Sequence, residues 1–109
     1  MARFINKELY QRVSLNDLII FSIFSVLKEK QKCDFEKLIK ECFELFPKAF
    51  GFAKISKWPD SRKLDRPLRS LRKRKLIKGD PKTYFSLTLA GKDRAEEVAK
   101  IFQQQSLKI

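Results

Sequence analysis

Apolar residues recur along this chain with the spacing of amphipathic helices. From Ser14 to about Lys30 they surround nearly the whole helical circumference, which predicts a helix buried on most sides. A second series follows Asp34 and keeps the i, i+3, i+4 spacing as far as Phe46. Ser14 or Asn16 can cap the first helix and Asp34 the second, because their side chains accept hydrogen bonds from free backbone N–H groups. Both helices are expected to form the core.

The opposite side of the second helix carries charges of both signs. Its charged positions are Glu36, Lys37, Lys40, Glu41 and Glu44. Mixed charge at helical spacing is typical of a solvated surface. A ligand site on this face is therefore not expected.

A third helix is predicted within residues 60–75 (DSRKLDRPLRSLRKRK). At about 100° per residue, Leu64, Leu68 and Leu71 share one narrow stripe. A cationic stripe lies roughly 180° from it by the same arithmetic: Arg62, Arg66, Arg69 and Lys73. Such a helix has one side for a core and an unbroken basic side for a partner.

Pro67 interrupts this third pattern. Proline has no backbone N–H, and it disfavours the helical conformation at the residue before it. Asp65 can serve as a second cap just before Arg66 and Pro67. The sequence therefore predicts an entry turn over residues 60–64 and a rigid main helix over 65–75.

After Lys75 the period changes from helical spacing to alternation. Leu76–Lys78 and Thr83–Thr88 are the predicted strands, joined by the turn-rich sequence GDPK. Their buried face is expected to hold Phe85, Leu87 and Leu89. A final helix is expected from Thr88 or Gly91 to about Gln105, with Ala95, Val98, Ala99 and Phe102 on its core side.

Two segments have a weaker pattern. Residues 1–13 form either a flexible arm or a short helix that packs on the domain or on a second copy. Residues 48–59 are irregular, and we expect Ile55 and Trp58 to anchor them to the core, although basic residues among aromatics also suit stacking on unpaired bases. The predicted domain covers residues 14–105, and residues 106–109 form a tail.

The charge of the chain is concentrated in one region. The net charge is +12 over 109 residues, which is room for one domain with a sizeable core. Residues 54–82 contain twelve Lys and Arg against three Asp, and so carry +9 of that total. This concentration predicts a polyanionic partner for the third helix and its surroundings.

Several classes of protein are disfavoured by the composition. There is no histidine, and the two cysteines, Cys33 and Cys42, cannot build a common four-ligand zinc site alone. The usual general base and any glycine-rich phosphate loop are missing, so we expect neither an enzyme nor a cofactor. The longest apolar run, Leu18–Leu27, is too short to span a bilayer. A cytoplasmic protein without a membrane partner is the expectation.

The order of the predicted elements, together with two local patterns, resembles a winged helix-turn-helix domain over roughly residues 16–102. The patterns are Leu68-x-x-Leu71-x-x-x-x-Leu76-Ile77 and Tyr84-x-x-Leu87-Thr88-x-x-Gly91. The fold expected is mainly α with a small β-hairpin (α+β): a three-helix core, a wing and a C-terminal helix. Members of this family usually have glycine where this chain has Lys75 before Leu-Ile, and the connection over 47–60 is longer than a tight turn.

The resemblance implies that the third helix lies in the major groove of DNA and that the wing touches the backbone or minor groove. Arg62, Arg66 and Arg69 are then expected at base edges or adjacent phosphates, and Ser70 is compatible with the groove. The expected phosphate contacts are Lys57, Lys63, Lys73, Arg74, Lys78 and Lys82.

The function expected is sequence-selective binding of double-stranded DNA by a small transcriptional regulator, associated with the nucleoid when bound. A homodimer is compatible, by analogy with regulators that pair through terminal helices. Two alternatives stay open: an RNA- or ribosome-binding winged-helix protein, and a protein-interaction module for an acidic partner.

Overall fold

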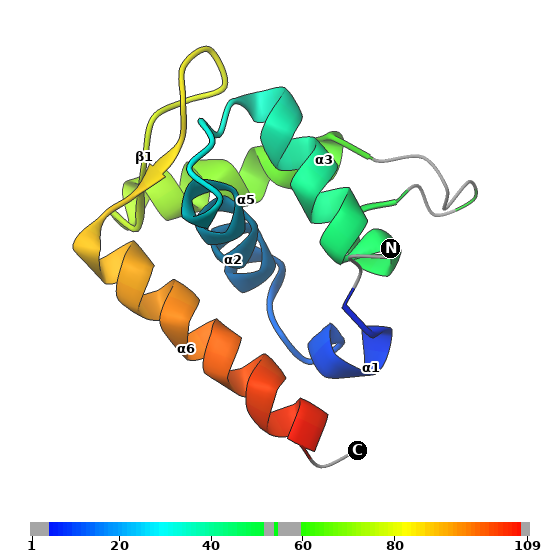
Figure 1. Cartoon of the computed structure of the whole chain (residues 1–109). Helices are drawn as coiled ribbons and strands as arrows, with labels where there is room; N and C mark the ends of the chain where they lie inside the picture. Colours follow the sequence, from blue (N-terminus) through cyan, green and yellow to red (C-terminus); the bar gives the residue numbers. More distant parts are fainter. Residues whose placement is uncertain (1–4, 52–53, 55–59, 108–109) are drawn as a thin grey trace.

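The computed structural model describes residues 5–51, 54 and 60–107 (Figure 1). This part is mainly helical with a small two-stranded antiparallel hairpin, which confirms the predicted α+β class. The elements are α1 (Lys7–Tyr10), α2 (Leu15–Lys28), α3 (Phe35–Leu45), α4 (Pro47–Phe50), α5 (Arg62–Lys73), β1 (Ile77–Lys78), β2 (Ser86–Leu87) and α6 (Leu89–Leu107).

Helix α2 is the central element of the core. It begins where the Ser14 hydroxyl accepts a hydrogen bond from the Asp17 backbone N–H at 3.2 Å. Ile19, Ile20 and Ile23 are fully buried, because α3, α5 and α6 all pack against this helix (Figure 1). The prediction of a helix buried on most sides is confirmed.

Helix α3 begins at its predicted cap, where Asp34 Oδ1 accepts from the Lys37 backbone N–H at 2.7 Å. Its predicted solvated face is wrong at one position. Glu41 is only 1% exposed, and Ser25 Oγ on α2 donates to its Oε2 at 2.6 Å. The reason is tertiary: α2 covers this edge of α3, and its serine gives the carboxylate a partner.

The N-terminal residues that the structure describes pack on the domain. The Ile5 N–H donates to the Leu45 carbonyl at 2.7 Å, and the Tyr10 hydroxyl accepts from the Lys48 N–H at 3.2 Å. Tyr10 is buried against the ring of Phe46, with centroids 5.0 Å apart. Residues 5–13 thus contain a short helix that packs on the domain.

The connection after α3 is less irregular than expected. Pro47 ends α3 as predicted, yet it also starts the single turn of α4, where its missing N–H costs nothing. Phe50 is buried, and its carbonyl accepts from the Asp60 N–H at 2.6 Å, which closes the connection. The predicted anchors Ile55 and Trp58 lie outside the described residues.

Helix α5 is continuous from Arg62 to Lys73 with Pro67 inside it, so the predicted division at this proline is wrong. Proline at position 67 removes one hydrogen bond, the one to the Lys63 carbonyl. Burial of Leu64, Leu68 and Leu71 on the core side, worth roughly 1.5–3 kcal/mol each, outweighs that loss. Tertiary packing therefore decides the helix boundary against local propensity.

Two lysines adopt the left-handed backbone conformation that closes a helix. Lys75 has φ 59°, and the N–H groups of Lys75 and Leu76 donate to the Arg72 and Leu71 carbonyls, both at 3.0 Å. This is the Schellman arrangement, in which glycine is the usual residue. Lys30, with φ 61°, ends α2 in the same way. The absence of glycine at position 75 therefore does not change how α5 ends.

The hairpin pairs Ile77 with Leu87 and Lys78 with Ser86. The sequence did not predict that a third segment pairs with the hairpin. Cys33 forms an isolated antiparallel bridge with Phe85, whose N–H donates to the Cys33 carbonyl at 2.7 Å. Phe85 is buried as expected. Leu89 is 79% exposed, which contradicts its predicted burial, because the alternation stops where α6 begins.

Thr88 and Gly91 join the hairpin to the last helix. The Thr88 hydroxyl donates to the Lys75 carbonyl at 2.8 Å and accepts from the Gly91 N–H at 3.1 Å, so it caps α6. A Cβ at Gly91 would lie 1.9 Å from the Leu76 carbonyl oxygen. Glycine is therefore needed three residues after the Thr88 cap so that α6 can approach the Leu76 carbonyl. Ala95, Val98 and Phe102 are buried on α6 as predicted.

Replacing Gly91 by Ala is expected to destabilise the protein by about 3 kcal/mol, because the added methyl overlaps a backbone carbonyl. Chemical denaturation with a circular-dichroism readout measures this. Ala90→Ser, at the exposed neighbouring position, is the matched control and should stay within about 0.5 kcal/mol of the parent. Equal stability of Gly91→Ala and the parent would contradict the close approach of α6 to Leu76.

Replacing Lys75 by Gly is expected to stabilise the protein by up to about 1 kcal/mol, because only glycine adopts a φ near +60° without steric cost. Thermal unfolding should show a higher midpoint. Lys73→Gly, inside the last turn of α5, should lower the stability by about 1 kcal/mol. If both variants were destabilised, the left-handed helix end would be wrong.

Candidate nucleic-acid interface

The outer face of α5 carries the predicted cationic stripe. Leu64, Leu68 and Leu71 are 0–2% exposed on the core side, and the four opposite side chains are exposed: Arg62, Arg66, Arg69 and Lys73. In Figure 1, α5 runs behind α2 and α3. The leucine burial thus fixes which face of the helix meets solvent.

Arg62 differs from the rest of the stripe. Its Nε and Nη2 donate to the two carboxylate oxygens of Asp60 at 3.1 and 3.3 Å. The Asp60 side chain is 8% exposed, and these hydrogen bonds hold the pKa of its carboxyl below the ordinary value. Asp60 also accepts from the Arg62 backbone N–H at 3.2 Å. Arg62 is therefore tied to the start of the helix, although its own side chain stays 80% exposed.

Lys63 was expected to bind phosphate, and the structure gives it a different contact. Its Nζ donates to the Gly51 carbonyl at 2.8 Å and to the Ala49 carbonyl at 3.3 Å. Both carbonyls lie at the C-terminal end of α4, where a helix leaves its last carbonyls without intrahelical donors. The ammonium thus connects α5 to the preceding segment.

Ser70 and Arg74 lie away from the exposed stripe. Ser70 is half-buried, and Arg74 lines a hollow of about 490 Å³ beside the starts of α2 and α6. Asp17, Asp93 and Glu97 also line this hollow. Arg94 crosses it: its Nε donates to Asp17 Oδ1 at 2.9 Å, and Nη1 donates to Glu97 Oε2 at 2.9 Å. The acidic groups make this a poor surface for phosphate.

The hairpin adds two exposed lysines to the stripe, Lys78 on β1 and Lys82 in its connection. Because α5 leads into β1 through only three residues, the end of the stripe and the hairpin are adjacent. Five of the predicted cations are exposed on α5 and on the hairpin that follows it: Arg66, Arg69, Lys73, Lys78 and Lys82. Lys57 lies outside the described residues.

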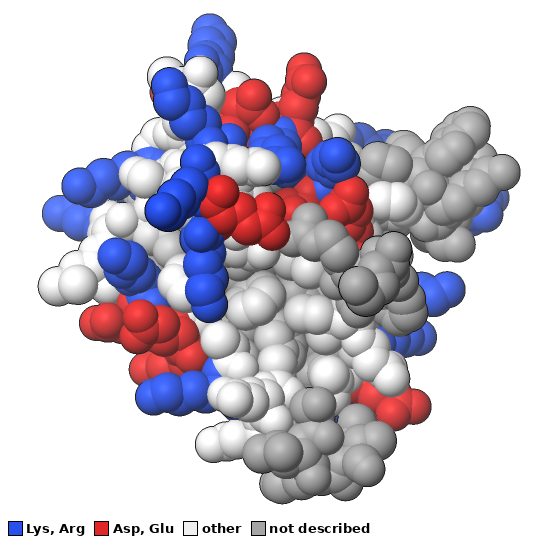
Figure 2. Space-filling model, viewed as in Figure 1, with Lys and Arg blue, Asp and Glu red and all other residues white. Residues whose placement is uncertain are grey.

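Sequence reasoning missed a second basic group. Lys28, Lys30 and Lys32 are exposed at the end of α2 and in the segment after it. The Cys33–Phe85 bridge brings this segment to the hairpin, and Lys32 Nζ lies 5.1 Å from the centre of the Tyr84 ring. Figure 2 shows Lys and Arg side chains gathered over the hairpin and this segment, with acidic side chains beside them over the start of α3. The alternating lysines were visible in the sequence, but their neighbour was not.

The thiols have little nucleophilic character. Cys33 and Cys42 are fully buried, and burial raises the pKa of Cys33 to about 12 and that of Cys42 further. Across the part of the chain that the structure describes, no group of three or more His, Cys, Asp or Glu side chains could hold a metal ion.

Comparisons with protein-family models, with curated proteins and with solved structures gave no significant match. None of the helices in the described ranges is both long enough and apolar enough to cross a membrane.

Replacing Lys63 by Met is expected to cost about 1–2 kcal/mol of stability while leaving nucleic-acid affinity nearly unchanged, because it removes two hydrogen bonds from a charged donor. Denaturation and a binding titration measure the two quantities. Arg66→Met on the same helix is the matched control and should keep its stability. A stable Lys63→Met protein with weakened binding would return Lys63 to a phosphate-binding role.

Proposed function

We propose that this chain is a winged helix-turn-helix protein that binds double-stranded DNA, with α5 in the major groove and the hairpin as the wing. The order of elements supports this proposal: α2, the bridging residue Cys33, α3, the single turn of α4, α5, then the β1–β2 hairpin and α6. Pairing of Cys33 with the second strand of the hairpin adds a short third edge to the sheet. The two-stranded wing follows α5 directly, as the proposed mechanism requires.

The observation that carries the proposal is the division of α5 into a buried leucine side and an exposed cationic side. A helix of this diameter enters the major groove, which is about 12 Å wide. Arginines on its outer face can donate paired hydrogen bonds to guanine O6 and N7. Arg66 and Arg69 are the proposed base-reading residues, since Arg62 is tied to Asp60 and Lys63 to backbone carbonyls.

The remaining cations of this face would grip the phosphate backbone. Lys73 ends the stripe, and Lys78 and Lys82 extend it along the hairpin. Each phosphate that the protein neutralises releases condensed counterions. For each such contact, the affinity for duplex DNA falls by about 0.9 decade for every tenfold rise in salt concentration. A small regulator of transcription is the proposed role, acting as a homodimer if its operator is palindromic.

Replacing Arg66 and Arg69 together by Ala is expected to lower duplex affinity by roughly 1–3 kcal/mol per base contact and to relax sequence preference. Thermal stability should stay nearly unchanged, because both side chains are exposed. Leu68→Ala should have the opposite effect and destabilise the fold by about 2–5 kcal/mol. Fluorescence anisotropy with a duplex selected from a random pool, together with thermal melts, separates the two effects.

The same titration should include duplex RNA and single strands. Tighter binding to duplex RNA than to any DNA would replace the proposal with RNA recognition. Absence of binding to every nucleic acid at low salt would favour an acidic protein partner for the same face. A recovered palindrome would support duplex reading and two-fold assembly together.

A further inference from the structure

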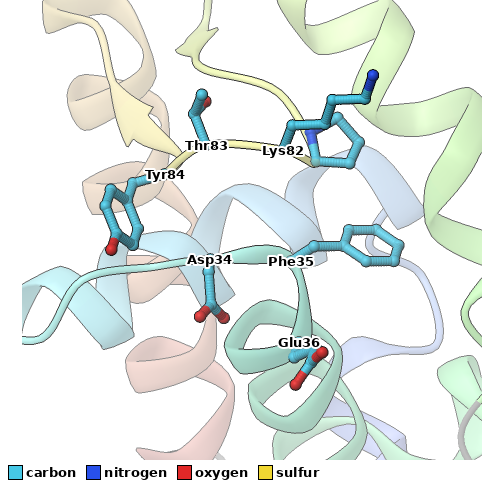
Figure 3. Close-up of a pocket in the computed structure, with 7 residues that line it drawn as sticks. Asp34, Phe35, Glu36, Lys82, Thr83 and Tyr84 are labelled. Atoms are coloured by element: carbon cyan, nitrogen blue, oxygen red, sulfur yellow. The ribbon is translucent and has the colours of Figure 1, made fainter.

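A hollow of about 600 Å³ lies between the hairpin and the start of α3 (Figure 3). Its walls are Asp34, Phe35 and Glu36 on the α3 side and Pro81, Lys82, Thr83 and Tyr84 on the hairpin side. It arises because residues 34–36 and 81–84 diverge as they leave the antiparallel Cys33–Phe85 bridge. Ligand sites in proteins commonly measure roughly 300–1,000 Å³, so a nucleobase with its sugar and phosphate has room here.

Tyr84 stands at one end of this hollow with much of its ring in solvent. The residue is 54% exposed, and within the described ranges only Leu89 is a comparably exposed large apolar residue. Lys32 Nζ lies 5.1 Å from the ring centre, so a cation is held against the aromatic. An exposed ring beside a cation is the combination on which unpaired bases stack while their phosphates are neutralised.

The charges around the hollow are divided between its two sides. In Figure 3, the Asp34 and Glu36 carboxylates point away from the hairpin segment, and the Lys82 side chain extends from the hairpin. Lys28, Lys30 and Lys32 lie exposed on the segment that the bridge joins to the hairpin. A polyanionic strand would therefore follow the hairpin side and avoid the acidic start of α3.

A double helix does not suit this surface. In a duplex the bases are stacked on one another, and only their edges are accessible in the grooves. Away from the ends of a duplex, Tyr84 can stack only on a base that has left the helix, whereas the bases of a single strand are available to it. The site therefore differs from the α5 face in the form of nucleic acid that it accepts.

We propose that the hollow and its lysines bind an unpaired segment of nucleic acid, with one base stacked on Tyr84 and neighbouring phosphates held by Lys32 and Lys82. Lys28 and Lys30 extend the cationic path for the same strand. This site shares Lys82 with the proposed duplex face, whereas Tyr84 and Lys32 belong to the hollow alone, so strand binding does not depend on Arg66 or Arg69. Together the two would favour a junction between duplex and single strand over either alone.

The experiment measures the affinity of the full chain for three labelled probes by fluorescence anisotropy. The probes are oligo-dT and oligo-rU of about twelve nucleotides, within the usual size of single-strand sites, and a blunt DNA duplex. Tyr84→Ala should weaken binding of a single strand about tenfold, while Tyr84→Phe should keep it within about twofold, because stacking needs the ring and not the hydroxyl. The two single strands separate a DNA from an RNA preference.

The controls also use exposed residues. Leu89→Ala removes the other exposed large apolar side chain of the described residues. It should change neither the single-strand affinity nor the duplex affinity. Tyr84→Ala should leave blunt-duplex affinity unchanged, and the Arg66→Ala/Arg69→Ala double variant should show the reverse pattern. Circular dichroism checks that each variant is folded, which is expected because all four side chains are exposed.

Equal binding of single strands by Tyr84→Ala and the parent would overturn the inference. An equal loss of strand and duplex affinity in that variant would also overturn it, because the hairpin would then serve duplex binding alone. Strand binding without duplex binding would support the hollow and remove the proposed duplex function. Duplex binding without strand binding would support the proposed duplex function and overturn the inference about the hollow.

Discussion

The packing of the α5 leucines against α2 is the constraint on which the rest of this structure depends. Leu64, Leu68 and Leu71 leave α5 one possible orientation, since exposing them would forfeit several kcal/mol of burial. That orientation sends the arginines outward and keeps Pro67 inside a continuous helix. The same packing carries the chain to Lys75, whose left-handed backbone turns it into β1. A hydrophobic requirement thus sets the position of every cation on this face.

A second constraint joins the hairpin to the body of the protein. Thr88 bonds the carbonyl of Lys75 and caps α6, and Gly91 lets α6 approach the Leu76 carbonyl. On the other edge, Cys33 holds Phe85. The hairpin is consequently held from both sides, and its lysines and Tyr84 have defined positions although its strands contain two residues each. Short strands would be marginal without these attachments.

Charge in this protein serves two purposes that residue type alone does not separate. Arg66, Arg69 and Lys73 extend from the leucine-anchored helix into solvent, whereas Lys63 and Arg62 complete hydrogen bonds at the start of that helix. The ammonium of Lys63 donates to carbonyls at the end of a single-turn helix, where intrahelical donors run out. A helical wheel gives the direction of each of these side chains around α5. It does not show which residues of other segments each side chain contacts.

The sequence by itself determined the helix start at Asp34, the leucine stripe, the hairpin and the last helix, because caps and periodicity are local properties. It left the start of α2 open between Ser14 and Asn16, and the structure shows that Ser14 is the cap. Only the tertiary structure decided the continuity of α5 through Pro67, the burial of Glu41 against Ser25 and the contact of Lys63 with the 49–51 carbonyls. Likewise, the hollow beside Tyr84 exists because residues 33 and 85 pair. Each of these features joins residues far apart in the chain. Local sequence patterns do not show which distant residue will supply the burial or the hydrogen bond that stabilises each one.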